Sequence, residues 1–282
     1  MHEYTETTSR YLTTNQAVDT LTRMRISERI SARLLSVRCQ EAQTHASRNQ
    51  DYASLVSRDN GTSLCFCVCD GVGSSYRGDF AAHYLATHLL AWLQEIPAIL
   101  HDLDTFTSTL HGLLDLWSYD ARLKLKKVAL PLRTPQLARE VMEELRDTYG
   151  SETVFLCGRI DAEPSLHQTQ AVFCWMGNVT ARLSLAPDQW VVLGDADDRA
   201  GRWSTLHGRR GQVSTWHTTL ATPEQLVIYT DGLEAIGSDL AILTDDEWHI
   251  QTQHLLLSPK NDDMTALEVR WGDSFSKGEQ AS

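Results

Sequence analysis

Two apolar runs of this sequence end in the same pair of residues, an aspartate followed by a glycine. The stretch SLCFCVCDG ends at Asp70-Gly71, and the stretch LVIYTDG ends at Asp231-Gly232. A single Asp-Gly pair is a common turn sequence. Two such pairs at strand ends predict carboxylates held on rigid backbone, each beside a residue that lets another group approach the main chain closely. These are the requirements of a metal site.

A third acidic position, Asp262, stands just before the last strand-forming run, MTALEVRW. Carboxylates that converge from several strand ends favour hard cations such as Mg²⁺ or Mn²⁺, which prefer oxygen ligands. The alternative is that these side chains are solvated loop residues, as most acidic side chains are. Spacing alone leaves both interpretations open.

The elements that must position these residues follow from the periodicity of the sequence. The run ARLLSVRC predicts a strand, and YASLVSRDNGTSLCFCVCD predicts a β-hairpin with Asp59-Asn60-Gly61 in its turn. Helical spacing follows around residues 81–93, 104–125 and 135–149. Beyond Gly150, six short β-rich runs alternate with turns. Strands, then a helical block, then strands again indicate an α+β fold.

Composition excludes some classes of partner and location. Lys and Arg total 25 against 37 Asp and Glu, a net charge of −12, which argues against nucleic acid or an anionic membrane as a partner. Without a signal peptide or an uninterrupted apolar span, the sequence predicts a cytoplasmic protein. Cys65, Cys67 and Cys69 alternate along one strand, which favours reduced buried thiols over a tetrahedral zinc site or disulfides.

Six motifs, taken in order, resemble the metal-dependent protein phosphatases, the type 2C serine/threonine phosphatase family, in its bacterial-type branch. Each motif is weak alone, but their order and approximate spacing over residues 32–271 carry the resemblance. The motifs are NQD (49–51), VCDGVGS (68–74), GSETVFLC (150–157), WMGNVTARL (175–183), IYTDGLEA (228–235) and NDDMTALEV (261–269).

The resemblance implies a four-layer α-β-β-α sandwich, in which helices flank two central, mostly antiparallel sheets and a two-metal site lies at one end. Asp70 would bridge two Mg²⁺ or Mn²⁺ ions, and the Gly71 carbonyl would bind one of them. Asp231 and Asp262 would complete the shell of the other ion, and Asp51 would orient or hold metal-bound water. The implied chemistry is hydrolysis of a phosphomonoester by a hydroxide that bridges the ions, without a covalent enzyme intermediate.

The sequence departs from the family pattern at several positions. Gln50 stands where many members carry Glu, and Asn178 replaces an Asp that serves a third, weaker ion in bacterial relatives, which argues against a third ion here. Val72 occupies the place of a His that protonates the leaving alkoxide in some relatives. His45 is the candidate to substitute for it, and Arg48 is the candidate to bind phosphate. Both have the alternative of being ordinary surface residues.

We therefore expect a catalytic domain over residues 31–272, with an N-terminal extension over 1–30, weakly helical in its second half, and a polar tail over 273–282. The expected activity is hydrolysis of phosphoserine or phosphothreonine in a protein substrate, either a serine/threonine kinase or its target. One alternative is a pseudophosphatase that binds a partner without turnover. Another is hydrolysis of a small phosphorylated metabolite. The helical region 104–149 has two interpretations: ordinary scaffold helices, or a docking surface for a partner.

Overall fold

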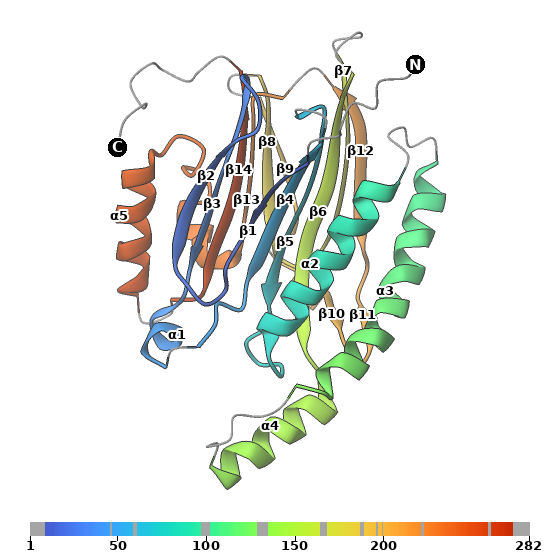
Figure 1. The fold of residues 1–282 in the computed structure, drawn as a ribbon, viewed down its shortest axis with the longest axis vertical. Helices are drawn as coiled ribbons and strands as arrows, with labels where there is room; N and C mark the ends of the chain where they lie inside the picture. The colour runs from blue at the N-terminus through green and yellow to red at the C-terminus, as the bar shows by residue number, and fades with distance from the viewer. Residues whose placement is uncertain are drawn as a thin grey trace, which may run out of the picture.

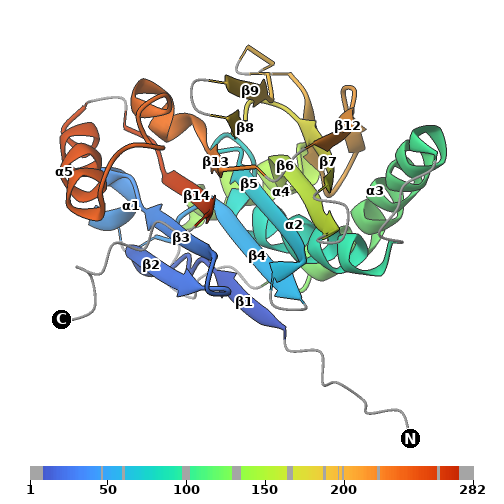
Figure 2. The same cartoon turned by 90° about the horizontal axis from the view of Figure 1, so that it is seen from above.

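The computed structural model describes residues 9–45, 47–58, 61–96, 102–128, 135–163, 168–186, 189–195, 197–198, 200–220, 223–258 and 261–272. Two antiparallel sheets lie face to face at its centre, with helices on both outer sides (Figure 1; Figure 2). The predicted α-β-β-α sandwich is confirmed. Asp59, Asn60 and the expected tail over 273–282 lie outside the described residues.

The first sheet contains the strand that carries Asp70. Its main path runs in the order β1-β4-β5-β6-β10-β11, and β7 pairs with both β6 and β12. The strands are β1 (Arg10–Thr13), β4 (Tyr52–Arg58), β5 (Ser63–Gly71), β6 (Glu152–Glu163), β7 (Gln168–Met176), β10 (Arg202–Ser204), β11 (Gly208–Arg210) and β12 (Ser214–Leu220). The predicted hairpin is formed by β4 and β5, which pair in register from Tyr52 opposite Cys69 to Arg58 opposite Ser63.

The second sheet contains the strands next to Asp231 and Asp262. Its order is β2-β3-β14-β13-β8-β9. The strands are β2 (Thr20–Arg25), β3 (Ile30–Val37), β8 (Thr180–Ala186), β9 (Gln189–Leu193), β13 (Gln225–Tyr229) and β14 (Met264–Trp271). Strands β13 and β14 are antiparallel neighbours in the middle of the sheet. The end of β13 therefore lies beside the start of β14.

Helices α2 (Gly78–Glu95) and α3 (Leu103–Leu125) cover the first sheet, whereas α5 (Asp245–Leu256) and the 3₁₀ helix η2 (Asp231–Ile236) cover the second (Figure 2). The short helix α1 (Gln40–Thr44) follows β3. Helix α4 (Gln136–Thr148) extends from one end of the sandwich, and none of its residues is buried (Figure 1). The three predicted helical regions are thus confirmed as α2, α3 and α4.

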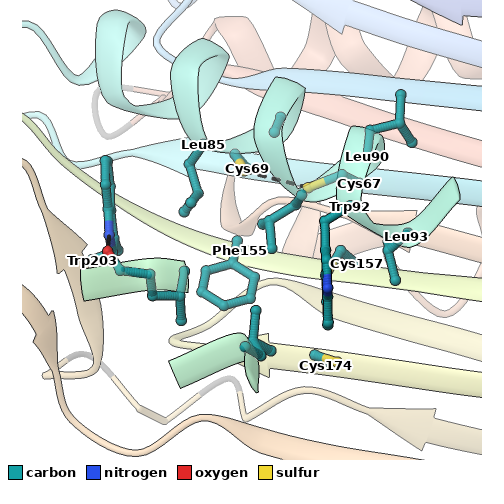
Figure 3. Packing of buried hydrophobic residues seen from close by; sticks show 14 of the residues in the cluster. Cys67, Cys69, Leu85, Leu90, Trp92, Leu93, Phe155, Cys157, Cys174 and Trp203 are labelled. Atoms are coloured by element: carbon teal, nitrogen blue, oxygen red, sulfur yellow. Dashed lines mark hydrogen bonds between the residues drawn. The ribbon is translucent and has the colours of Figure 1, made fainter. Parts of the chain in front are cut away.

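Strand β5 is apolar along its length because both of its faces are buried. Phe66 and Val68 pack between the two sheets, while the cysteines on the opposite face pack against α2. Figure 3 shows this second layer, where Cys67 and Cys69 lie among leucines of α2 and Phe155, with their sulfur atoms 3.6 Å apart. All six cysteines are free thiols, as predicted.

The expected start of the domain at residue 31 is wrong. Strand β1 pairs with β4 and strand β2 pairs with β3, so both sheets include residues from the segment predicted as an extension. The helical expectation for its second half is also wrong, because β2 occupies Thr20–Arg25. Strand β2 is half-exposed on an edge, so its sequence, TLTRMR, lacks the alternation of a one-sided strand. No helix in the described residues is both long enough and apolar enough to cross a membrane.

Candidate active site

The β4–β5 hairpin places two aspartates side by side. Asp51 immediately precedes β4, and Asp70 is the penultimate residue of β5. Because Tyr52 lies opposite Cys69 in the antiparallel register, the two aspartates continue the pairing by one residue. Asp51 is buried, with 1% of its surface exposed. The Thr153 hydroxyl donates to the backbone carbonyl of Asp70 over 2.6 Å and so fixes the end of β5 to β6.

The β13–β14 pair brings the other acidic residues to the same end of the sandwich. Asp231 follows β13 after Thr230, and Asp262 and Asp263 precede β14. The Thr230 amide donates to the Thr265 carbonyl over 3.0 Å, which keeps the two strand ends together. Asp231 and Asp262 are both exposed, whereas Asp263 is buried.

A hydrogen bond between side chains joins the two sheets at this end. The Thr230 hydroxyl donates to Asp51 Oδ2 over 2.8 Å, and Thr230 is fully buried. The same hydroxyl accepts from the Thr265 amide over 3.0 Å. Thr230 thereby fixes the first sheet's Asp51 relative to the strand end that carries Asp231. In the sequence, the only signal for Thr230 is its place directly before an Asp-Gly pair.

Asp263 has a positioning role that the sequence analysis also missed. Its carboxylate accepts from the backbone amides of Cys39 (2.7 Å) and Gln50 (2.5 Å), and thus connects β14 to the loops after β3 and before β4. Its neighbour Asp262 is exposed, and Asp262 Oδ1 accepts from the Asp263 amide over 2.8 Å. Of the adjacent pair, Asp263 faces the protein and Asp262 faces solvent. The role of Asp262 as a ligand stays a prediction.

Both Asp-Gly glycines are required by close backbone contacts. A Cβ atom on Gly71 would lie 2.5 Å from the Gln50 carbonyl oxygen and 2.6 Å from the Gly78 carbonyl carbon. A Cβ atom on Gly232 would lie 2.2 Å from the Asp263 carbonyl oxygen. Neither glycine has a positive φ angle, so its requirement is space for neighbouring backbone and not turn geometry.

Burial and neighbouring carboxylates raise the pKa values of two aspartates at this end of the sandwich, Asp70 and Asp51. Burial raises the pKa of Asp70 well above its ordinary value, and repulsion from Asp231 and Asp262 raises it further. Burial likewise raises the pKa of Asp51, with the charge of Asp70 as the next cause. The hydrogen bond that the Thr230 hydroxyl donates to Asp51 opposes the rise in the pKa of Asp51. Concentrated negative charge of this kind is relieved by protonation or by a cation.

The side chains fit a hard divalent cation in the chemistry of their donor atoms. Asp70, Asp231 and Asp262 offer carboxylate oxygens, which Mg²⁺ and Mn²⁺ prefer, and they lie close enough to repel one another. Within the described parts of the chain, no three His, Cys, Asp or Glu side chains already surround one point as metal ligands do. The residues therefore fit the predicted ions in donor type and charge, but they are not gathered into a ligand shell.

Asn178 contacts one of these carboxylates, that of Asp231. It follows Gly177 in the turn between β7 and β8, and its Nδ2 donates to Asp231 Oδ2 over 2.8 Å. The neutral amide thus stabilises Asp231 as a carboxylate, where an aspartate would repel it.

We expect Asn178→Asp to lower the melting temperature of the metal-free protein and to raise its Mn²⁺ affinity several-fold, because it replaces a hydrogen-bond donor beside Asp231 with a second negative charge. Thermal unfolding in EDTA and calorimetric titration with Mn²⁺ measure the two effects. Unchanged Mn²⁺ affinity would show that position 178 lies outside the cation site.

The remaining predicted residues lie around this cluster. Gln50 packs its side chain against Gly78, and its Oε1 atom is buried without a hydrogen-bond partner. Arg48 is exposed. Burial lowers the pKa of His83 on α2, and the positive charge of Arg48 lowers it further. His45 is exposed at the end of α1. No contact connects Arg48 or His45 to the carboxylates in the described residues, so their roles stay predictions.

Arg77, in the loop after Asp70, forms an ion pair with Asp79. Its guanidinium contacts Asp79 through two nitrogens, at 2.7 and 3.2 Å. Arg77 adopts a left-handed conformation with φ of 55° directly before α2, which is uncommon for a residue with a side chain. The loop from Val72 to Arg77 is therefore tightly specified by local geometry.

Glu152 also contacts the loop from Val72 to Arg77. No motif in the sequence pointed to this role. Its backbone carbonyl accepts from Val72 (3.0 Å) and its amide donates to the Ser75 hydroxyl (3.0 Å). Its side chain is 2% exposed and binds Arg202 and Arg210 of the β10–β11 hairpin, at 3.3 and 2.9 Å. Glu152 thus connects the loop after Asp70-Gly71 to this hairpin.

Comparison with known proteins identifies similar folds. The sequence matches no protein-family model and no curated protein. A crystal structure of RsbX in complex with magnesium is 15% identical and superposes with a TM-score of 0.56, over 90% of this chain and 100% of that one. A bacterial serine phosphatase carrying a point substitution is 14% identical with a TM-score of 0.53, over 85% and 97% of the two chains.

The serine/threonine phosphatase Stp1 from Staphylococcus aureus is 14% identical with a TM-score of 0.52, over 88% of this chain and 97% of that one. In each case the match covers nearly the whole of the known structure. At these identities the similarity establishes fold. The chain therefore has the fold of the metal-dependent serine/threonine phosphatases that its motifs resemble.

Proposed function

We propose that this chain is a metal-dependent protein serine/threonine phosphatase that acts in the cytoplasm on phosphoserine or phosphothreonine of a kinase or its target. The observation that carries the proposal is the meeting of carboxylates from four strand ends at one end of the sandwich: Asp51, Asp70, Asp231 and Asp262. The fold shared with serine phosphatases supports the reaction class, and the magnesium in the RsbX structure supports a divalent cation.

In this proposal, each residue has a separate task. Asp70 and the Gly71 carbonyl would hold the cations from the first sheet, and Asp231 and Asp262 would hold them from the second. When bound, divalent cations would supply positive charge that neutralises the phosphate dianion and lowers the pKa of water. Asp51, fixed by Thr230, orients the attacking water. The protein's contribution is the placement of these groups before substrate binds.

Arg48 is the proposed phosphate-binding residue, with its guanidinium suited to two phosphate oxygens. We expect Arg48→Ala to raise KM about tenfold with a smaller fall in kcat, because the interaction is made in the ground and transition states alike. Steady-state kinetics with a phosphothreonine peptide measure this split. A fall in kcat at unchanged KM would assign Arg48 a different role.

A pseudophosphatase is the second candidate, and two observations favour it. Gln50 and Asn178 each place a neutral amide where the family motif carries an acid, and Asn178 bonds directly to Asp231. This function requires that the protein bind a phosphoprotein without turning it over.

Hydrolysis assays test the proposal and separate the candidates. Purified protein is incubated with phosphoserine and phosphothreonine peptides and with small phosphorylated metabolites, in Mg²⁺, in Mn²⁺ and in EDTA. The proposal predicts release of phosphate from the peptides that depends on the cation and stops in EDTA. Turnover of metabolites alone would change the substrate class, and binding of phosphopeptides without turnover would support the pseudophosphatase.

A further inference from the structure

Helix α3 has one face packed on the protein and an opposite face of apolar residues in solvent. The packed face carries Phe106, Leu110, Leu114, Ser118, Ala121 and Leu125. On the outer face, Leu116 is 62% exposed, Tyr119 67% and Leu123 44%. Helix α3 lies at the outer edge of the molecule, beyond α2 (Figure 2), and contacts β10 and β11. This surface, residues 112, 116, 119 and 123, is called the α3 seam below.

The spacing of the α3 seam is that of a helix-pairing surface. Gly112, Leu116, Tyr119 and Leu123 follow one another at intervals of four, three and four residues, the a/d pattern of a heptad repeat. Single exposed apolar residues are normal on a protein surface. A continuous row at this spacing, on the side of the helix facing away from its own domain, is what a second helix would cover.

Gly112 gives an independent reason for a helix partner. It lies in the middle of a helix of 23 residues, and a Cβ atom there would meet no atom within 4 Å. Glycine in a helix interior costs about 1 kcal/mol relative to alanine. None of the described residues around Gly112 requires that cost. A glycine at this position of the seam lets the backbone of a second helix approach closely, beside the large side chains of Leu116 and Tyr119.

The charges along α3 indicate which helix would pair with it and in which direction. Its amino-terminal end is acidic, with Asp102 as the N-cap and Asp104 in the first turn. Its carboxyl-terminal end is basic, with Arg122 and Lys126, while Lys124 pairs with Asp120 of the same helix over 2.9 Å. Two copies of α3 laid antiparallel place the acidic end of each beside the basic end of the other, and also oppose their helix dipoles. A parallel pair would place like charges together.

We propose that the α3 seam is the interface of a homodimer, in which two copies of this chain pair their α3 helices antiparallel about a two-fold axis. Such an interface is self-complementary, since the same patch serves on both subunits. Leu116 lies near the middle of the seam and Gly112 lets the axes approach. The candidate active site lies at one end of the sandwich and contributes no residue to the seam. The proposal is therefore independent of the proposed function.

Sedimentation velocity over a wide concentration range tests the proposal on the full chain. We expect a reversible dimer, and we expect Leu116→Glu to weaken it about tenfold or more, because a central apolar contact becomes a charge. Leu257→Glu is the matched control, because Leu257 is also exposed, at 80%, but lies beyond α5 on the other side of the sandwich. Gly112→Ala should also weaken the dimer while leaving the monomer fold intact, since its Cβ meets no atom in the monomer.

A charge exchange tests the antiparallel orientation. Asp104→Lys or Lys126→Glu alone should weaken the dimer, and the two together in one chain should restore it, because each end of the seam again faces its opposite charge. Circular dichroism verifies that α3 remains helical in every variant. A wild type that stays monomeric at all concentrations, or a dimer unaffected by Leu116→Glu, would overturn the proposal. Failure of the charge exchange to restore pairing would overturn the antiparallel arrangement.

Discussion

Asp70→Asn is expected to abolish cation-dependent phosphate hydrolysis and to raise the melting temperature of the metal-free protein. The loss of activity should be about a thousandfold or more, equivalent to several kcal/mol of transition-state stabilisation. The gain in stability follows from removing a charge that burial and the neighbouring Asp231 and Asp262 already disfavour. A gain of about 1 kcal/mol corresponds to a shift of about 2–4 °C in a domain of this size.

The direction of the stability effect is fixed by proton linkage. The pKa of Asp70 is raised on folding, so between the ordinary aspartate pKa and the raised value the folded protein binds more protons than the unfolded chain. Raising the pH through that interval lowers the free energy of unfolding of the metal-free protein. The Asp70→Asn variant, which cannot ionise, should show a weaker pH dependence over the same interval.

Thermal unfolding in EDTA and in Mn²⁺, together with phosphate release, measures these effects. The wild type should gain stability in Mn²⁺, and Asp70→Asn should gain little. Asp147→Asn, which removes one negative charge from the exposed surface of α4, is the matched control and should behave as the wild type does. A variant at position 70 that unfolds at a lower temperature than wild type in EDTA would contradict the account of carboxylate repulsion.

Gly71→Ala is expected to destabilise the protein by about 1–3 kcal/mol and to lower kcat by up to about a hundredfold. The added methyl group would lie 2.5 Å from the Gln50 carbonyl oxygen and 2.6 Å from the Gly78 carbonyl carbon. Both are backbone atoms, so relief requires moving the loop that carries Asp51 or the start of α2. Either movement displaces the carboxylates relative to one another.

Gly73→Ala is the matched control for this substitution. Gly73 lies two residues further along the same loop, and a Cβ there would meet its nearest atom, Gln50 Oε1, at an ordinary 3.8 Å. We expect a free energy of unfolding close to that of the wild type and a kcat within a small factor of the wild-type value. Chemical denaturation and steady-state kinetics measure both variants. Equal behaviour of Gly71→Ala and Gly73→Ala would show that the close approach at Gly71 is not needed.

The sequence predicted those helices and strands whose buried residues recur in a regular pattern. Strand β5 is apolar on both faces, and α2 carries a buried stripe, so their patterns are unambiguous. Strand β2 was missed because, on the edge of a sheet, it is neither alternating nor continuously apolar. Helix α1 is only five residues long and carries one buried residue, Ala42, which gives periodicity too little length to detect.

The sequence pointed to the carboxylates that meet at this end of the sandwich, but not to the residues that position them. Strand ends marked by Asp-Gly identified Asp70 and Asp231, and family resemblance separated Asp262 from its neighbour. Asp263 and Thr230 were missed because their roles depend on contacts between segments far apart in the chain. Asp263 bonds to the loops at Cys39 and Gln50, and Thr230 bonds to Asp51, 179 positions away. No local pattern carries information of that kind.

The central claim is that the two Asp-Gly strand ends are halves of one cation site, and calorimetric titration of Mn²⁺ into metal-free protein tests it most directly. The account predicts saturable binding to the wild type, with binding greatly weakened by either Asp70→Asn or Asp231→Asn and unaffected by Asp147→Asn. Loss of binding in both site variants would show that carboxylates from the two sheets share the ion. Wild-type affinity in Asp231→Asn, with binding lost only in Asp70→Asn, would contradict it.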